Sequence, residues 1–81
     1  MSTSLKTEQA LDAGDLVITV KAIKRPGLIF SSEAVPKGTP GVVLARKNRW
    51  LKADELTVRF ENGEIFGIDV GENYVVGVGE F

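Results

Sequence analysis

The residues of this chain that suit chemistry are carboxylates at predicted turns and cations gathered around a single tryptophan. The chain has no histidine and no cysteine, so a catalytic triad, a thiol nucleophile and an ordinary zinc site lack their parts. Solvated charge is typical of strand ends and turns, so we predict no catalytic residue, no cofactor and no metal ligand among the carboxylates. These carboxylates are Asp54, Glu55, Glu61, Glu64, Asp69 and Glu72.

A basic cluster surrounds the tryptophan at position 50. Interleaved cations and an aromatic ring suit nucleic acid, because cations contact phosphates and an indole can stack on a base. Alternatively, the tryptophan packs on the fold and the cations cover its rim. The formal net charge of -1 favours that alternative, since nucleic-acid-binding domains are more often basic overall. The candidate nucleic-acid residues are Arg46, Lys47, Arg49, Trp50 and Lys52, with Lys24 and Arg25 earlier in the chain.

Two apolar segments indicate a protein interface. Residues 16–23 are apolar on both alternating sets, whereas a strand with one solvated face carries polar residues on one set. The run "GLIF" follows Pro26, and its apolar side chains cannot all point into a small core, so some of them form an exposed patch. The alternative is that both segments simply complete the core. The candidate interface residues are Ile18, Val20, Leu28, Ile29 and Phe30.

Short strands must position these residues. Residues 55–60 alternate cleanly between apolar and polar side chains, and Asn62-Gly63 is a strong signal for a tight hairpin. All three prolines lie in 24–40, which we therefore predict to be a long loop or a bent hairpin, because proline removes strand hydrogen bonds. We predict five strands, over residues 16–23, 41–47, 55–60, 64–69 and 74–78.

At 81 residues the chain has room for one domain. Residues 1–13 are polar, and we predict a flexible or helical lead-in there, followed by the domain proper over 14–81. A chain of this size buries only about 60% of the surface that its unfolded form exposes, so its stability is marginal. Disulfides are excluded by the absence of cysteine, which leaves self-association as the expected support.

The order of connection lengths resembles the SH3-like barrel: a long loop, a medium loop, a tight hairpin and a single turn. The resemblance covers residues 14–78 and is carried by "GD.V" at Gly14, "G..G.V" at Gly38 and "V.F.NG" at Val58. Similar patterns occur in the nitrile hydratase β-subunit domain, the variable subunit of ferredoxin-thioredoxin reductase, the E subunit of photosystem I and ribosomal KOW modules. This resemblance implies an all-β, five-stranded barrel that serves as an accessory subunit, although fold alone does not assign function.

A comparison with another class of small barrels keeps an enzyme among the alternatives. Plasmid-encoded type II dihydrofolate reductases build one site from symmetric small subunits. Here "EIFGID" lies near the strand that carries their Val-Gln-Ile-Tyr run, but it lacks the Gln and the Tyr. An enzyme whose site forms only at an oligomer axis is therefore the weaker alternative.

Together these patterns predict a non-catalytic protein-binding or accessory-subunit module that associates with itself. The alternative partner is nucleic acid, bound through residues 46–52. No apolar run approaches the roughly 20 residues needed to span a bilayer, so no membrane contact is expected. The first 15 residues lack the apolar core of a signal peptide, so we expect a cytoplasmic protein.

Overall fold

The computed structural model describes residues 4–25 and 32–79, which consist largely of β-strands. Most strands coincide with segments rich in valine, isoleucine and other residues that favour extended backbone. The strands are β1 (Ser4–Lys6), β2 (Leu16–Thr19), β3 (Ile23–Arg25), β4 (Ser32–Val35), β5 (Pro40–Lys47), β6 (Glu55–Phe60), β7 (Ile65–Asp69) and β8 (Val75–Gly79). One 3₁₀ turn, η1 (Glu8–Ala10), follows β1.

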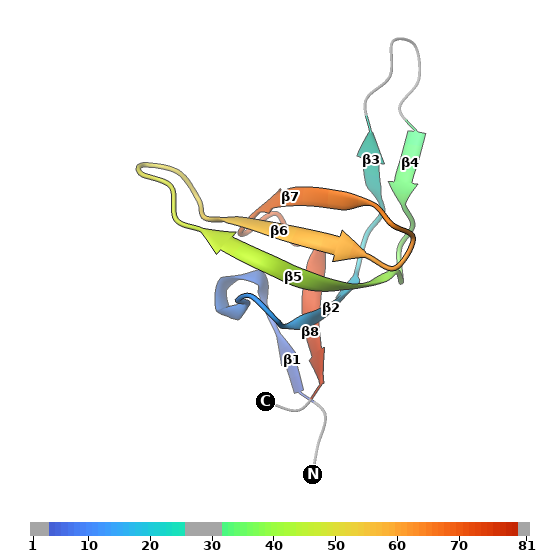
Figure 1. Ribbon diagram of the computed structural model, residues 1–81, viewed down its shortest axis with the longest axis horizontal. Coiled ribbons are helices and arrows are strands. Elements are labelled where there is room, and N and C mark those ends of the chain that lie inside the picture. Colours follow the sequence, from blue (N-terminus) through green and yellow to red (C-terminus); the bar gives the residue numbers. More distant parts are fainter. Residues whose placement is uncertain (1–3, 26–31, 80–81) are drawn as a thin grey trace.

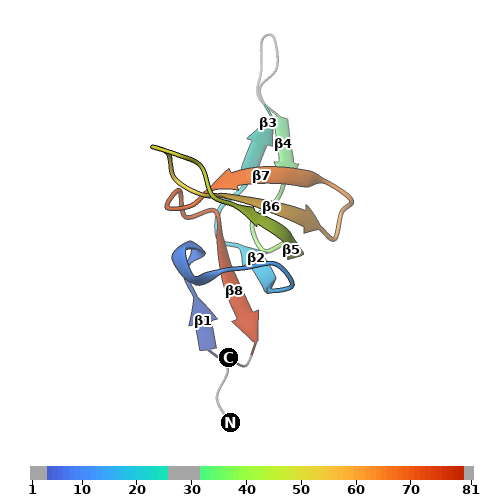
Figure 2. The same ribbon diagram turned by 60° about the vertical axis from the view of Figure 1, so that its left-hand side comes forward.

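The strands form two antiparallel sheets (Figure 1). The larger sheet has six strands in the order β1-β8-β2-β5-β6-β7, and β3 pairs with β4 in a separate two-stranded sheet. In Figures 1 and 2, β1 and β8 run across the direction of β6 and β7, so the larger sheet is strongly twisted. The all-β prediction is confirmed. Within the described residues, however, β1 and β7 are the edge strands of this sheet and do not pair with each other. Strand pairing therefore does not close the predicted five-stranded barrel.

The core lies on the inner face of the larger sheet. Leu56, Val58 and Phe60 alternate along β6 and are almost fully buried, whereas Arg59 points to solvent, as the sequence pattern predicted. Each strand from β2 to β8 adds at least one apolar side chain to the same cluster. The other members are Leu11, Val17, Ile23, Val35, Val43, Ile68, Val70 and Val75.

The predicted first strand is broken in two. The sequence pattern predicted one strand over 16–23, but β2 ends at Thr19 and β3 begins at Ile23. The reason is a change of partner: β2 pairs with β5 and β8, whereas β3 pairs with β4. β4 itself lies in the segment that was predicted to be a long loop or a bent hairpin, and its antiparallel pairing with β3 agrees with the hairpin. Pro36 and Pro40 stand just after β4 and at the first residue of β5, where proline is tolerated.

Residues 4–13 are part of the folded domain, although the sequence predicted a flexible or helical lead-in. β1 pairs with β8, so the larger sheet includes a strand from this segment. Leu11 is fully buried in the core, and Glu8 is buried as well. The polar composition of the segment gave no sign of this role, because Glu8 and Leu11 are the only buried side chains among those described in residues 6–13.

The Asn62-Gly63 hairpin joins β6 to β7 as predicted, and it supplies a first test of the fold. Gly63 has a φ of 90°, which side chains other than glycine and asparagine rarely adopt. Gly63→Val is therefore expected to lower the free energy of unfolding by roughly 1–3 kcal/mol through backbone strain. Space is not limiting, since no atom lies within 4 Å of a Cβ built at this position. Urea denaturation measures the change.

Gly63→Asn serves as the control for this variant, because asparagine tolerates positive φ better than valine does. We expect it to lose only a fraction of the stability that the valine variant loses. Equal denaturation midpoints for the wild type and the valine variant would contradict the turn geometry.

Candidate functional site

The face of β2 that points away from the core is apolar. Val17 and Thr19 point inward and are buried, whereas Leu16 is 59% exposed, Ile18 is half-buried and Val20 is exposed. The strand is therefore apolar on its outer side as well, which is the pattern that led to the interface prediction. The structure places the predicted interface residues Ile18 and Val20 on this side. The other three predicted interface residues, Leu28, Ile29 and Phe30, lie outside the described residues.

Cross-strand neighbours extend this surface across the larger sheet. Leu16 stands opposite Val42 on β5, Val42 opposite Arg59 on β6, and Arg59 opposite Ile65 on β7. On the other side of β2, Ile18 stands opposite Val76 on β8. We call this surface the outer face and define it by Leu16, Ile18, Val42, Ile65 and Val76.

A shallow groove of about 440 Å³ opens at one end of the outer face. Leu16, Pro40 and Val42 give it apolar walls, and Arg59 and Glu61 add one charge of each sign. Within residues 4–25 and 32–79, neither of these two charged side chains takes part in an ion pair. In the described part of the chain, the groove therefore combines apolar surface with a cation and an anion that form no ion pair.

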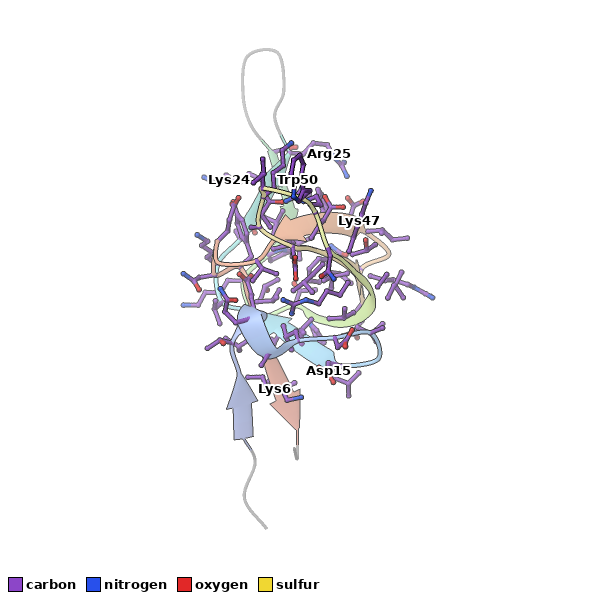
Figure 3. All side chains as sticks on the ribbon, turned by 90° about the vertical axis from the view of Figure 1, so that its left-hand side faces the viewer. Lys6, Asp15, Lys24, Arg25, Lys47 and Trp50 are labelled. Carbon is purple, nitrogen blue, oxygen red and sulfur yellow. The ribbon has the colours of Figure 1, made fainter. Side chains whose placement is uncertain are left out.

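The connection between β5 and β6, residues 48–54, projects beyond the sheet (Figure 1). Trp50 is 90% exposed and Leu51 is 84% exposed, so both apolar side chains project into solvent. Lys47 and Lys52 beside them are also exposed, and Figure 3 views the molecule from this side. We refer to residues 47–52 as the hairpin tip. The interpretation in which Trp50 packs on the fold is wrong.

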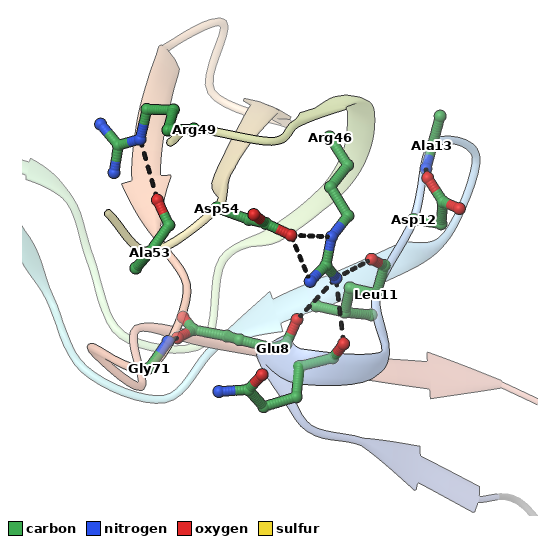
Figure 4. A network of polar contacts seen from close by, with 10 residues as sticks. Glu8, Leu11, Asp12, Ala13, Arg46, Arg49, Ala53, Asp54 and Gly71 are labelled. Atoms are coloured by element: carbon green, nitrogen blue, oxygen red, sulfur yellow. Dashed lines mark hydrogen bonds and ion pairs between the residues drawn. The ribbon is translucent and has the colours of Figure 1, made fainter. Parts of the chain in front are cut away.

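Arg46 is held by the N-terminal segment and does not face solvent as a free cation (Figure 4). Its Nη1 donates to the backbone carbonyls of Gln9 at 3.0 Å and Leu11 at 2.7 Å, with a longer contact of 3.4 Å to the Glu8 carbonyl. Its Nε and Nη2 contact the Asp54 carboxylate at 3.0 and 2.9 Å. All these contacts lie within the chain, so Arg46 stabilises the fold.

Arg49 is likewise occupied. Its Nη2 donates to the Asp69 carboxylate at 2.6 Å, and its Nη1 lies 3.8 Å from the Glu55 carboxylate. Its Nε donates to the Ala53 carbonyl at 2.9 Å (Figure 4). On β3, Lys24 is exposed and Arg25 pairs with the Glu64 carboxylate. The structure thus separates the predicted basic cluster into paired arginines and exposed lysines.

The buried carboxylate of Glu8 fixes the turn that precedes β8. Its Oε1 accepts hydrogen bonds from the backbone N–H groups of Gly71 at 3.0 Å and Asn73 at 2.8 Å. Its Oε2 accepts from those of Tyr74 at 2.9 Å and Val75 at 3.2 Å. Sequence reasoning missed Glu8, because its donors lie 63 to 67 residues further along the chain and no local pattern marks them.

The chain matches no protein-family model, no curated protein and no solved structure. In the part of the chain that the structure describes, no helix has the length and apolar character needed to cross a membrane. The assignment of function therefore rests on the outer face, the groove and the hairpin tip.

Proposed function

We propose that this chain is a non-catalytic protein-binding module that associates with itself, or serves as an accessory subunit, through its outer face. The observation that carries the proposal is the run of aliphatic side chains across β8, β2 and β5 on the side opposite the core. An apolar sheet face of this kind is typical of a protein contact, because leaving it in water forgoes hydrophobic stabilisation. A small domain gains most from such a contact, since its own core is small.

We further propose that the fold is an SH3-like small barrel. What supports this is the order of the connections between the five predicted strands, together with the strong twist of the larger sheet (Figure 2). In this interpretation, β2, β5, β6, β7 and β8 are the central strands. The β3–β4 hairpin is then an elaboration of the long loop, and β1 extends one edge.

Nucleic-acid binding through residues 46–52 is the second candidate function, favoured by the exposure of Trp50. An exposed indole next to lysines suits stacking on single-stranded bases. Arg46 and Arg49 are engaged within the chain, however, so Lys47 and Lys52 are the cations left to contact phosphates in this segment. Two cations give only a weak attraction to a polyanion, so we rank protein contact first.

Replacing Leu16 by serine tests the proposed function. Leu16 is more than half exposed, so the substitution removes apolar surface from the outer face with little disturbance of the core. We expect self-association to weaken by about tenfold or more, since truncating a hot-spot residue of an interface costs about 2 kcal/mol or more. Sedimentation equilibrium gives the dissociation constant, and far-ultraviolet circular dichroism verifies that the β structure persists.

Lys24→Ser is the matched control, because Lys24 is exposed on β3 in the other sheet. Its dissociation constant should equal that of the wild type. If Leu16→Ser associates as strongly as the control, the outer face is not the contact surface.

A further inference from the structure

The groove and the hairpin tip lie at opposite ends of the same two-stranded ribbon, β5–β6. Pro40 begins β5 and Phe60 ends β6 at the groove end, whereas Lys47 and Glu55 adjoin the tip at the other end. The ribbon is long, because the eight residues of β5 span about 26 Å at the usual rise per strand residue. The projecting hairpin tip and the groove are thus separated by the length of this ribbon.

We propose that two copies of the chain associate reciprocally, with Trp50 and Leu51 at the tip of each copy inserted into the groove of the other. This inference rests on the proposed self-association and specifies which surfaces meet. It assigns a role to the hairpin tip, which the outer face alone does not explain.

Apolar surface is the first match between tip and groove. Trp50 and Leu51 are the two most exposed large apolar side chains in the described part of the chain, and they are adjacent. The groove offers about 440 Å³ lined in part by Leu16, Pro40 and Val42. A buried tryptophan removes roughly 150–250 Å² from water, which makes it a common anchor at protein contacts.

Charge is the second match. Near the tip, Asp54, Glu55 and Asp69 are neutralised by Arg46 and Arg49, so the exposed cations beside Trp50 set the local charge. Among the described residues, Lys47 and Lys52 have no acidic partner.

Glu61 at the groove likewise has no cation within its own chain in the described part, and a lysine of an inserted tip would supply one. Arg59 on the groove wall has no ion pair among residues 4–25 and 32–79 either, and its guanidinium would lie beside the inserted indole, where cation–π attraction is favourable. Both charged residues of the groove therefore gain a partner from the same tip.

A two-fold axis allows both contacts to form at once. If two outer faces stack with their ribbons antiparallel, a two-fold axis passes near the middle of the ribbons, and each tip reaches the groove end of the other copy. Such an arrangement closes at two copies and uses the same surface on each, as most small homodimers do. Packed sheet faces lie about 10 Å apart, so long side chains at the ribbon ends span the gap.

The fluorescence of Trp50 tests this arrangement directly, because it is the single tryptophan of the chain. Concentrating the protein through the association range is expected to move the emission to shorter wavelength and to protect it from acrylamide quenching. The midpoint of this change should coincide with the dissociation constant from sedimentation equilibrium. Trp50→Ser and Leu51→Ser should each weaken association by about tenfold or more.

A charge reversal separates the proposed contact from general effects of charge. Glu61→Lys is expected to weaken association by about tenfold, since it places a cation opposite Lys52 of the other copy. Lys52→Glu alone should weaken it as well, and the two changes together should restore association to near the wild-type level. Glu72→Lys, an exposed glutamate in the turn before β8, is the matched control and should leave association unchanged.

Several outcomes would overturn this inference. If the chain dimerises while Trp50 stays fully quenchable and Trp50→Ser associates normally, the outer face associates without the tip, and only the proposed function stands. If the wild type stays monomeric at every concentration, self-association and the reciprocal arrangement both fail. If the Trp50 emission responds to a single-stranded oligonucleotide at low salt but not to protein concentration, the tip is a nucleic-acid contact instead.

Discussion

Replacing Glu8 by alanine is expected to lower the free energy of unfolding by about 3–5 kcal/mol, a large share of the stability of a small domain. Glu8 is 1% exposed, and its carboxylate accepts hydrogen bonds from four backbone N–H groups, three in the turn before β8 and one at the first residue of β8. Alanine would leave these donors without their acceptor in a partly buried position. Thermal and urea denaturation, followed by circular dichroism, measure the loss.

Two further variants make this result specific to the carboxylate. Gln9 lies in the same 3₁₀ turn and is exposed, so Gln9→Ala should change the free energy of unfolding by less than about 0.5 kcal/mol. Glu8→Gln keeps one acceptor oxygen and should lose an intermediate amount. A Glu8→Ala protein with the wild-type melting midpoint would contradict the described role of this side chain.

Phe60→Ala is the second change for which a large effect is expected, about 3–5 kcal/mol of unfolding free energy. Phe60 is 1% exposed and is the largest buried side chain in the described core. Its ring packs over Gly41, where a Cβ atom would come within 2.9 Å of the ring. Phe60→Ala would leave a cavity next to Gly41, and the neighbouring strands would not close it completely.

The measurement is again denaturant unfolding, with Phe60→Leu as the conservative comparison. Leucine fills much of the same volume, so Phe60→Leu should keep most of the stability that Phe60→Ala loses. If Phe60→Ala unfolds at the same urea concentration as Phe60→Leu, the ring does not pack as described.

The strands that the sequence predicted best are those whose side chains alternate. β6 was predicted at the observed bounds, because its inward positions are all apolar and its outward positions are polar. The hairpin at Asn62-Gly63 was equally clear, since glycine relieves the strain of positive φ at position 63. Both signals are local, because each depends only on residues that are neighbours in the chain.

The features that were missed depend on contacts between distant segments. The break between β2 and β3 reflects a change of pairing partner, which a run of apolar residues does not reveal. The role of residues 4–13 depends on β8 and on the turn before it, at the opposite end of the chain. A polar segment that pairs with a distant strand has no periodic pattern of its own.

The candidate surfaces were predicted in part. The apolar outer side of β2 was visible in the alternation of the sequence, and the exposure of Leu16 and Val20 agrees with it. The basic cluster was a less reliable guide, because charge alone does not tell a free cation from a paired one. Arg46 differs from Lys47 through carbonyl acceptors 35 to 38 residues earlier in the chain.

Sedimentation equilibrium of the wild-type chain tests the central proposal most directly. Over a range from sub-micromolar to hundreds of micromolar, we predict a reversible rise in the mass from 8.7 kDa to twice that value. The rise is expected because burying two outer faces against each other removes apolar surface from water. A chain that stays folded at 8.7 kDa over the whole range would contradict self-association and the proposal built on it.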